Sequence, residues 1–271
     1  MMKPSPETTG FWWYLYIPAL ILTVCLMLPP VMSQFAQTGL RGLYLLVVSG
    51  SISFCLTPIC IWIAARYNIL DIPDARKTHQ TATPLLGGAA VFVSFLLAIV
   101  YNGIFNPAVC SILYATLLIF IVGLLDDIHE VSAKLKLMAQ ITAVIVVVQQ
   151  GVILRVVPLQ LGMTAQVANL ALTFLWIIGI TNAMNFFDGM NGLAAGLGAM
   201  IAFFLGLVAF QTDQVFIGWI SIAIMGSCLG FLPYNLRGKG KASVFLGDAG
   251  STVIGFVLAC IAVYSDWASH D

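Results

Sequence analysis

Long apolar segments recur along almost the whole chain, and they limit its fold more than any other feature. Hydrophobic residues make up 61% of the sequence and charged residues 8%, far below the roughly 25% charged residues of a soluble domain. A helix of about 20 apolar residues crosses a ~30 Å hydrocarbon core, whereas barrel strands would alternate apolar and polar positions. The sequence therefore predicts an all-α, polytopic bundle of transmembrane helices with about nine spans, at residues 11–32, 43–65, 85–102, 107–125, 135–150, 167–185, 193–210, 214–233 and 248–264.

The apolar runs are not interrupted by a repeat or a low-complexity tract, so we expect residues 1–271 to form a single integral-membrane domain. The first run, 11–32, is rich in interfacial aromatics and lacks a clear cleavage site, which predicts a retained helix. Residues 151–166 are compatible with a small interfacial hairpin. The six cysteines lie in apolar runs without CxxC spacing, which predicts buried thiols rather than a disulfide framework or a zinc site.

Charged residues are distributed unevenly between the two predicted faces. With the N-terminus in the cytoplasm, the inner face carries Lys3, Arg66, Arg76, Lys77, Lys134, Lys136, Arg237, Lys239 and Lys241, and the outer face carries Arg41 and Arg155. This asymmetry follows the positive-inside rule. The inner face also holds most of the acids: Glu7, Asp71, Asp74, Asp126, Asp127, Glu130, Asp188 and Asp248. A net charge of zero argues against a nucleic-acid partner.

The segment 181–193 places oxygen-bearing side chains at three-residue intervals: Asn182, Asn185, Asp188 and Asn191. On a helix this spacing puts them along one drifting stripe. Gly189 and Gly192 follow where the helix should end, and glycine permits a left-handed turn there. The stripe indicates either an ordinary helix terminus leaving the lipid or a site for a metal ion and a phosphate-bearing ligand.

Two loops on the same predicted face add charged clusters. The loop 71–79 carries Arg76, Lys77 and His79, which are suited to hold phosphate oxygens or to act as positive-inside anchors. Asp126 and Asp127 end a span at the negative pole of its helix dipole, which is unfavourable unless a cation compensates. An exposed loop start is the alternative interpretation of these acids.

Two more residues complete the inner-face set. Lys134 follows the acidic pair and is suited to bind a phosphate as a point charge. Asp248 begins the last span, where it is either an N-cap or a hard oxygen ligand for magnesium. A site that combines a cation with phosphate-binding groups on one membrane face indicates chemistry on a phosphorylated substrate.

Taken in order, these motifs resemble the polyprenyl-phosphate N-acetylhexosamine-1-phosphate transferase family, glycosyl transferase family 4. The resemblance covers residues 71–256 through Asp71-x-Pro-Asp-x-Arg-Lys-x-His79, Asp126-Asp127 with Lys134, Asn182-x-x-Asn185-x-x-Asp188-Gly-x-x-Gly192, and Phe245-Leu-Gly-Asp248-Ala-Gly-Ser251. It implies transfer of N-acetylhexosamine 1-phosphate from a UDP-sugar to polyprenyl (undecaprenyl) phosphate, with Mg²⁺ as cofactor and release of UMP. The Phe-Phe-Asp-Gly-Met-Asn-Gly variant looks closer to the N-acetylglucosamine branch.

The resemblance also implies roles for individual residues. Asn185 and Asp248 correspond to the metal-binding pair, Asp126 and Asp127 to the catalytic acidic pair, and Asp188 is expected to be a third catalytic residue in contact with substrate. Substrate contacts are expected from Arg76, Lys77, His79, Lys134, Asn182 and Asn191. The implied setting is the inner (plasma) membrane, with the site facing the cytoplasm and taking part in cell-envelope polysaccharide synthesis, such as that of O-antigen. A homodimer is left open.

The chain departs from the family pattern in two places. Asn191 stands where many members have a second aspartate, and the usual histidine-rich C-terminal loop is missing, since the histidines are His79, His129 and His270. An inactive truncated paralogue or assembly partner is therefore an alternative to an active enzyme. A small-solute transporter fits less well, because the polar groups gather at one face. For an active enzyme, we expect direct attack by the lipid phosphate rather than an aspartyl-phosphate route.

Overall fold

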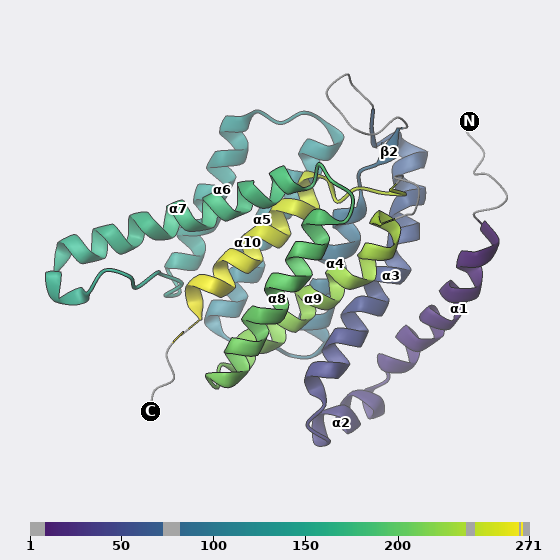
Figure 1. The fold of residues 1–271 in the computed structure, drawn as a ribbon, viewed down its shortest axis with the longest axis horizontal. Helices are drawn as coiled ribbons and strands as arrows, with labels where there is room; N and C mark the ends of the chain where they lie inside the picture. The colour runs from purple at the N-terminus through teal and green to yellow at the C-terminus, as the bar shows by residue number, and fades with distance from the viewer. Residues whose placement is uncertain (1–8, 73–81, 237–241, 266, 268–271) are drawn as a thin grey trace.

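The computed structural model describes residues 9–72, 82–236, 242–265 and 267, which are almost entirely helical (Figure 1). Its helices are α1 (Thr9–Leu26), α2 (Pro29–Gln37), α3 (Arg41–Tyr67), α4 (Gly87–Tyr101), α5 (Pro107–Ile128), α6 (Ala133–Val148), α7 (Met163–Phe187), α8 (Leu193–Gln211), α9 (Val215–Asn235) and α10 (Gly247–Tyr264). A short 3₁₀ helix spans Leu159–Leu161, and strands β1 (Leu70–Asp71) and β2 (Thr83–Pro84) pair antiparallel. The predicted all-α, polytopic architecture is confirmed.

The predicted count of nine spans is not confirmed. Among the described residues, six helices are long and apolar enough to cross a membrane: α3, α5, α7, α8, α9 and α10. A seventh span results only if α1 and α2 are taken together, and these two helices are bent by 73° at the break between them. Helices α4 and α6 contain 15 and 16 residues, fewer than the roughly 20 that a bilayer core requires.

The prediction treated residues 11–32 as one continuous span, but the structure breaks this run into two helices. Helix α1 ends at Leu26, and α2 begins with Pro29 and Pro30 at its first two positions. Proline lacks the backbone N–H of a helical hydrogen bond and clashes with the preceding turn. A single proline, Pro18, is accommodated within α1, but two in succession disfavour its continuation, and both fit the first turn of a new helix.

The predicted hairpin within residues 151–166 does not form. Residues 152–157 run without regular secondary structure, and side chains of α7 satisfy their backbone. Asn169 Oδ1 accepts hydrogen bonds from the N–H groups of Val156 and Val157, and Thr173 Oγ1 accepts one from Leu154. The segment therefore lies along α7 without pairing to itself.

The cysteines form no disulfide, as predicted, but they are not uniformly buried. All six are free thiols. Cys55, Cys228 and Cys260 are buried, whereas Cys25 on α1 is exposed. Because α1 packs at the edge of the bundle (Figure 1), its outer face meets the surroundings rather than other helices.

Helix α10 lies at the centre of the bundle (Figure 1), and 83% of its 18 residues are buried. Its first turn approaches α4 and α5 closely. A Cβ on Gly88 would overlap the backbone of Gly250, and one on Gly123 would lie 2.6 Å from the Ala249 Cα. Because glycine has no side chain, the three helices can meet backbone to backbone.

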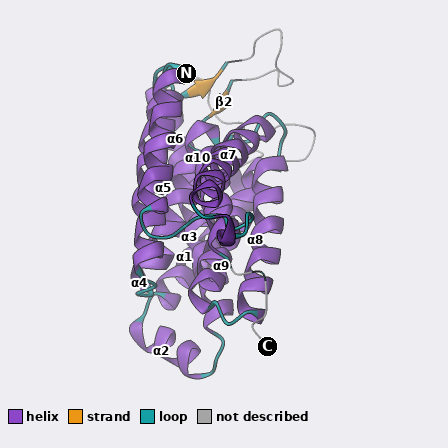
Figure 2. Cartoon of the chain, turned by 90° about the vertical axis from the view of Figure 1, so that its left-hand side faces the viewer, coloured by secondary structure: helices purple, strands orange, loops and turns teal. Residues whose placement is uncertain are grey.

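The start of α10 defines one end of the molecule. In the perpendicular view of Figure 2, β1 and β2 lie at one end of the bundle and α2 at the other. The N–H groups of Gly87 and Gly88 donate to the carbonyls of Phe245 and Leu246 at 3.0 and 2.8 Å, which anchors the residues before α10 to the start of α4. Helices α5 and α7 end here and α6 and α10 begin here. We call this the acidic end, after Asp126, Asp127, Asp188 and Asp248.

Candidate active site

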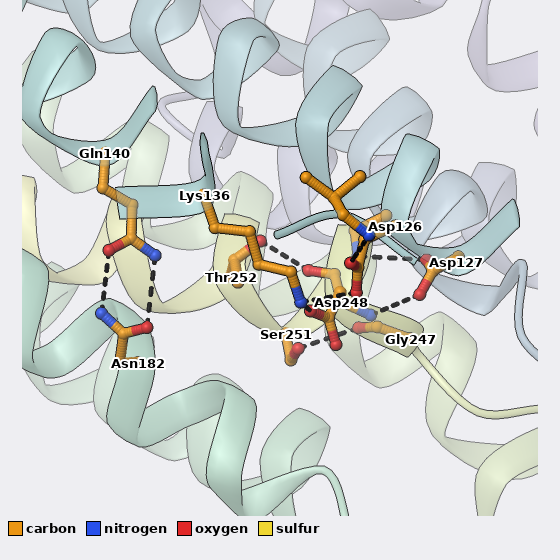
Figure 3. Close-up of polar contacts among 11 residues, drawn as sticks. Asp126, Asp127, Lys136, Gln140, Asn182, Gly247, Asp248, Ser251 and Thr252 are labelled. Atoms are coloured by element: carbon orange, nitrogen blue, oxygen red, sulfur yellow. Dashed lines mark hydrogen bonds and ion pairs between the residues drawn. The ribbon is translucent and has the colours of Figure 1, made fainter. Parts of the chain in front are cut away.

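Four carboxylates from three helices meet at the acidic end. Asp126 and Asp127 lie in the last turn of α5, Asp188 is the C-cap of α7, and Asp248 lies in the first turn of α10. Figure 3 shows Asp126, Asp127 and Asp248 gathered around the start of α10. Carboxylates held this close repel one another, so the structure must supply compensating donors or cations.

Asp127 is compensated by the N-terminus of α10. Its Oδ1 accepts the Asp248 N–H at 2.7 Å and its Oδ2 accepts the Ala249 N–H at 3.1 Å. The N-cap residue of α10 is Leu246, which has no side-chain cap of its own. Asp127 therefore caps α10 from another helix, where the positive pole of the helix dipole favours a carboxylate. The sequence interpretation of Asp248 as the N-cap is wrong.

Gly247 makes this cap sterically possible. Its φ is +70°, in the left-handed region that side chains rarely adopt. A Cβ at this position would lie 2.5 and 2.6 Å from the two carboxylate oxygens of Asp127. Only glycine therefore allows the α10 backbone to bend and to approach Asp127 at the same point.

Lys136 compensates the other member of the acidic pair. Its Nζ donates to Asp126 Oδ2 and to Asp248 Oδ2, each at 2.6 Å. Burial alone would lower the pKa of this ammonium, but the hydrogen bonds and charges of the two carboxylates outweigh burial and raise the pKa above its usual value. Asp126 also accepts the Val131 N–H at 2.8 Å. The cation expected beside Asp126 and Asp127 is thus a lysine of this chain, placed against Asp126.

The end of α7 brings the polar stripe to the same place. Asp188 Oδ2 accepts the Gly247 N–H at 3.0 Å, and the Asn185 side chain lies beside the Asp248 carboxylate. Asn185, Asp188 and Asp248 therefore lie together, with the expected metal pair, Asn185 and Asp248, side by side. Asn185 and Asp188 are three residues apart along α7, which puts them on the same face of the helix.

Asn182, one turn earlier, faces α6 instead. Its Nδ2 donates to Gln140 Oε1 at 2.8 Å, and its Oδ1 accepts from Gln140 Nε2 at 3.3 Å (Figure 3). Asn191, at the end of the stripe, is exposed in the turn before α8. The four residues of the predicted stripe therefore do not share one environment. Asn185 and Asp188 lie at the acidic end, Asn182 binds Gln140 of α6, and Asn191 is exposed.

The turn after Asp188 is held by a residue that sequence reasoning missed. Asn235, 2% exposed at the end of α9, accepts the Gly192 N–H at 2.5 Å and donates to the Val244 carbonyl at 2.8 Å. Gly192, the N-cap of α8, has a φ of +74°, so the left-handed conformation forms at this one of the two predicted glycines and not at Gly189. Asn235 thus links the turn after α7 to the segment that enters α10.

Other predicted residues lie apart or outside the described residues. Arg76, Lys77 and His79 belong to residues 73–81, outside the part of the chain that the structure describes. Lys134 is exposed in the first turn of α6, and the lysine that contacts the carboxylates is Lys136. Helix register explains the difference: Lys136 and the buried Gln140 are four residues apart and share a face, while Lys134 points elsewhere. The signal in the sequence was thus a lysine and a glutamine at helical spacing.

The donor set of the acidic end is compatible with a magnesium ion. The described residues contain no group of three or more His, Cys, Asp or Glu side chains with metal-binding geometry. Magnesium, however, commonly takes one or two protein oxygens and completes its shell with water and phosphate. Asp248 and Asn185 carry such oxygens on neighbouring side chains, and the Lys136 ammonium between two carboxylates shows that positive charge is stabilised here.

Comparison with known proteins identifies one family. A sequence model of glycosyl transferase family 4 matches residues 109–266. A probable undecaprenyl-phosphate N-acetylglucosaminyl 1-phosphate transferase of Bacillus subtilis is 34% identical over 216 residues, which cover 77% of this chain and 58% of that protein. A decaprenyl-phosphate N-acetylglucosaminephosphotransferase of Mycobacterium tuberculosis is 34% identical over 248 residues, covering 83% and 60%.

A relative from a second branch is matched over more of its length. The phospho-N-acetylmuramoyl-pentapeptide-transferase of Halalkalibacterium halodurans is 30% identical over 243 residues, which cover 80% of this chain and 73% of that protein. The alignments thus span somewhat more than half of the Bacillus and Mycobacterium proteins and nearly three quarters of the Halalkalibacterium protein.

Proposed function

This chain belongs to glycosyl transferase family 4, and on that premise we propose that it transfers N-acetylglucosamine 1-phosphate from UDP-N-acetylglucosamine to a polyprenyl phosphate. The proposal is supported by two relatives, each 34% identical, whose names specify N-acetylglucosamine and a polyprenyl phosphate. The UDP donor, the release of UMP and the magnesium ion are parts of the proposal that come from the family resemblance of the motifs.

The observation that carries the proposal is the convergence of Asp126, Asp248 and Lys136 at a membrane-edge helix junction. Two carboxylates share one ammonium at 2.6 Å, and Asn185 and Asp188 approach from α7. The reaction brings together two anions, a nucleoside diphosphate sugar and a lipid phosphate. A site for such a reaction needs both cations and oxygen ligands, and this cluster contains both.

The lipid phosphate is the nucleophile in this mechanism. One of its oxygens attacks the phosphorus that bears the sugar, and the bond from that phosphorus to the bridging oxygen breaks as UMP leaves. A phosphate has a second pKa near 6, so the attacking group is largely deprotonated at neutral pH. Proton removal is therefore not the main task of the protein, and its residues act by holding charges in place.

The two adjacent aspartates have different roles in this proposal. Asp127 uses both oxygens to cap α10, so it positions Asp248 rather than touching substrate. Asp126 is held by Lys136 and the Val131 N–H and is the member of the pair placed to orient the reacting groups. When a diphosphate is bound, Lys136 can shift from the carboxylates to phosphate oxygens, because ammonium binds either kind of anion.

Asn185 and Asp248 would hold the magnesium ion, which supplies positive charge to the diphosphate and the departing nucleotide when bound. Asp188 supports this pair from beside it by binding the Gly247 N–H. Lys136 pairs with Asp126 and Asp248 and so reduces the net negative charge around the proposed metal-binding oxygens. The sequence has further basic residues at 76–79 and 237–241, outside the described residues, and phosphate binding by Arg76, Lys77 and His79 stays part of the proposal.

The location of the site agrees with a lipid acceptor. A polyprenyl chain keeps its phosphate at the membrane surface, and the acidic end lies where apolar helices α5, α7 and α10 begin or end. The predicted orientation puts this end in the cytoplasm of a cell with a plasma (inner) membrane, where UDP-sugars are found. The proposed product is a lipid-linked sugar diphosphate that begins a cell-envelope polysaccharide.

The test is a reconstituted assay. Purified protein in detergent is incubated with polyprenyl phosphate, Mg²⁺ and a panel of UDP-N-acetylhexosamines, and both UMP and the lipid product are measured. The expected result is product only with the N-acetylglucosamine donor, the lipid and the metal together. Absence of product from chain that is folded and supplied with all three would contradict the proposal, and a phosphorylated Asp126 or Asp127 would overturn direct attack.

A further inference from the structure

We propose that Gln140 is a positioning residue, which clasps Asn182 and so fixes the end of α7 that carries Asn185 and Asp188 against the helix that carries Lys136. The inference rests on the proposed function for its kinetic consequences. Its structural part stands on the contacts between α6 and α7 alone.

The contact is a reciprocal amide pair. Gln140 Nε2 donates to Asn182 Oδ1 at 3.3 Å, and Asn182 Nδ2 donates to Gln140 Oε1 at 2.8 Å (Figure 3). The Gln140 side chain is only 5% exposed. A buried amide without partners is costly, and Asn182 provides a partner for both its nitrogen and its oxygen. Asn182 itself is exposed, so the pair lies at the edge of the α6–α7 contact and satisfies the polar atoms of its buried member, Gln140.

Asn182 is already committed within the protein. Besides its bond to Gln140, its Nδ2 donates to the Ile178 carbonyl at 2.8 Å. Both hydrogens of the amide are therefore used, one along α7 and one across to α6. This assigns Asn182 to the support of the site, in contrast to the substrate contact that the family resemblance implies for it.

The clasp lies next to the reacting groups on both helices. Gln140 is one turn beyond Lys136 on α6, and Asn182 is one turn before Asn185 on α7. Helix α7 extends away from the bundle (Figure 1), and only 22% of the residues in its most apolar 18-residue stretch are buried. At its acidic end α7 packs against α10, where Thr181 and Met184 meet Gly255, but its contacts with α6 are sparse. The polar clasp therefore has a large share in fixing α7 relative to α6.

The clasp should therefore act on the rate more than on binding. A displacement of about 1 Å in a catalytic arrangement can cost on the order of 100-fold in rate. Loss of the clasp lets α6 and α7 shift relative to each other, which moves Lys136 relative to Asn185 and Asp188. The lipid acceptor still reaches the same membrane edge, so its KM should change little.

The kinetic test uses four variants: Gln140→Ala, Asn182→Ala, the exchange Gln140→Asn with Asn182→Gln, and the control Gln149→Ala. The exchange keeps the combined length of the two side chains and restores an amide pair. We expect each single variant to lower kcat about tenfold or more, with the KM for polyprenyl phosphate within about twofold of wild type. The exchange should recover most of the rate. Gln149 is exposed at the C-cap of α6, and its variant should behave as wild type.

An exchange variant no faster than the two alanine variants would overturn the proposal, as would alanine variants with wild-type kcat. A second measurement does not depend on activity. Thermal unfolding of Gln140→Ala, Asn182→Ala and the double alanine variant forms a double-mutant cycle. The clasp predicts that the second substitution adds little to the loss in Tm caused by the first, whereas additive losses would contradict it. If wild-type protein transfers no sugar phosphate, the proposed function fails, and the cycle still tests the clasp.

Discussion

Lys136 is the residue on which the charge balance of the acidic end depends. Its ammonium is the group that bridges Asp126 and Asp248. Without it the two carboxylates would face each other, and a bound diphosphate would lose a cation. A neutral side chain of similar length removes this charge and keeps most of the apolar stem.

The change Lys136→Met is therefore expected to lower kcat/KM for the UDP-sugar by on the order of 100-fold, comparable with the loss of one preorganised stabilising group in other enzymes. The matched control is Lys134→Met, on the same helix but exposed, which should retain activity within about threefold because solvent-exposed charges contribute little. UMP release under initial-rate conditions measures both. Equal losses in the two variants would show that Lys136 acts through general surface charge.

Asp248 serves a different purpose from Lys136, since it is the acid expected to bind the metal. Asp248→Ala should abolish transfer without preventing membrane insertion, because its side chain points into the polar cluster rather than the lipid-facing surface. Membrane fractionation checks insertion, and product formation over a range of Mg²⁺ concentrations checks activity. A variant with full activity would exclude Asp248 as the metal ligand.

Among the helices and strands, the acidic end depends most on the start of α10. Three helices converge there only because Gly88, Gly123 and Gly247 lack side chains. The N-terminal N–H groups of α10 bind Asp127 and Asp188, so the direction of this helix fixes where Asp248 stands. A small displacement of α10 would disturb several contacts of the site together.

The substitution Gly247→Ala tests this dependence. The new Cβ would meet the Asp127 carboxylate at 2.5 Å in a left-handed backbone, and such strain costs of order 1–3 kcal/mol. We expect a lower Tm and a loss of activity of at least about tenfold, in line with the cost of misplacing catalytic groups. Gly196→Ala is the control, since a Cβ there has nothing within 4 Å, and it should leave both Tm and activity nearly unchanged. Normal activity of Gly247→Ala would show that Asp127 does not need its cap geometry.

For the whole molecule, the sequence predicts the helices better than their contacts. Apolar runs indicate helices because each must satisfy its own backbone in lipid, and the acids stand out because they interrupt those runs. The choice of Lys136 over Lys134 required knowing where α6 begins. Gln140 and Asn235 find their partners 42 and 43 residues away, and no local pattern encodes such pairing. The break before Pro29 is the reverse case. The two prolines are a local signal for the end of a helix, but the prediction of one span at 11–32 followed the length of the apolar run instead.

The orientation of the whole molecule decides whether a UDP-sugar can reach the acidic end. Lys134 begins α6 at the acidic end, whereas Arg155 lies between Leu154 and Val156, which bind the half of α7 farther from that end. Helix α7 is long enough to cross a membrane, and both side chains are exposed. In a background without the six native cysteines, we expect Arg155→Cys to react with a membrane-impermeant maleimide in intact cells. Lys134→Cys should react only after the membrane is permeabilised. The positive-inside distribution of lysine and arginine favours this result. The opposite labelling pattern would place the acidic end outside the cytoplasm, where UDP-sugars are not supplied, and would remove the basis for the proposed donor.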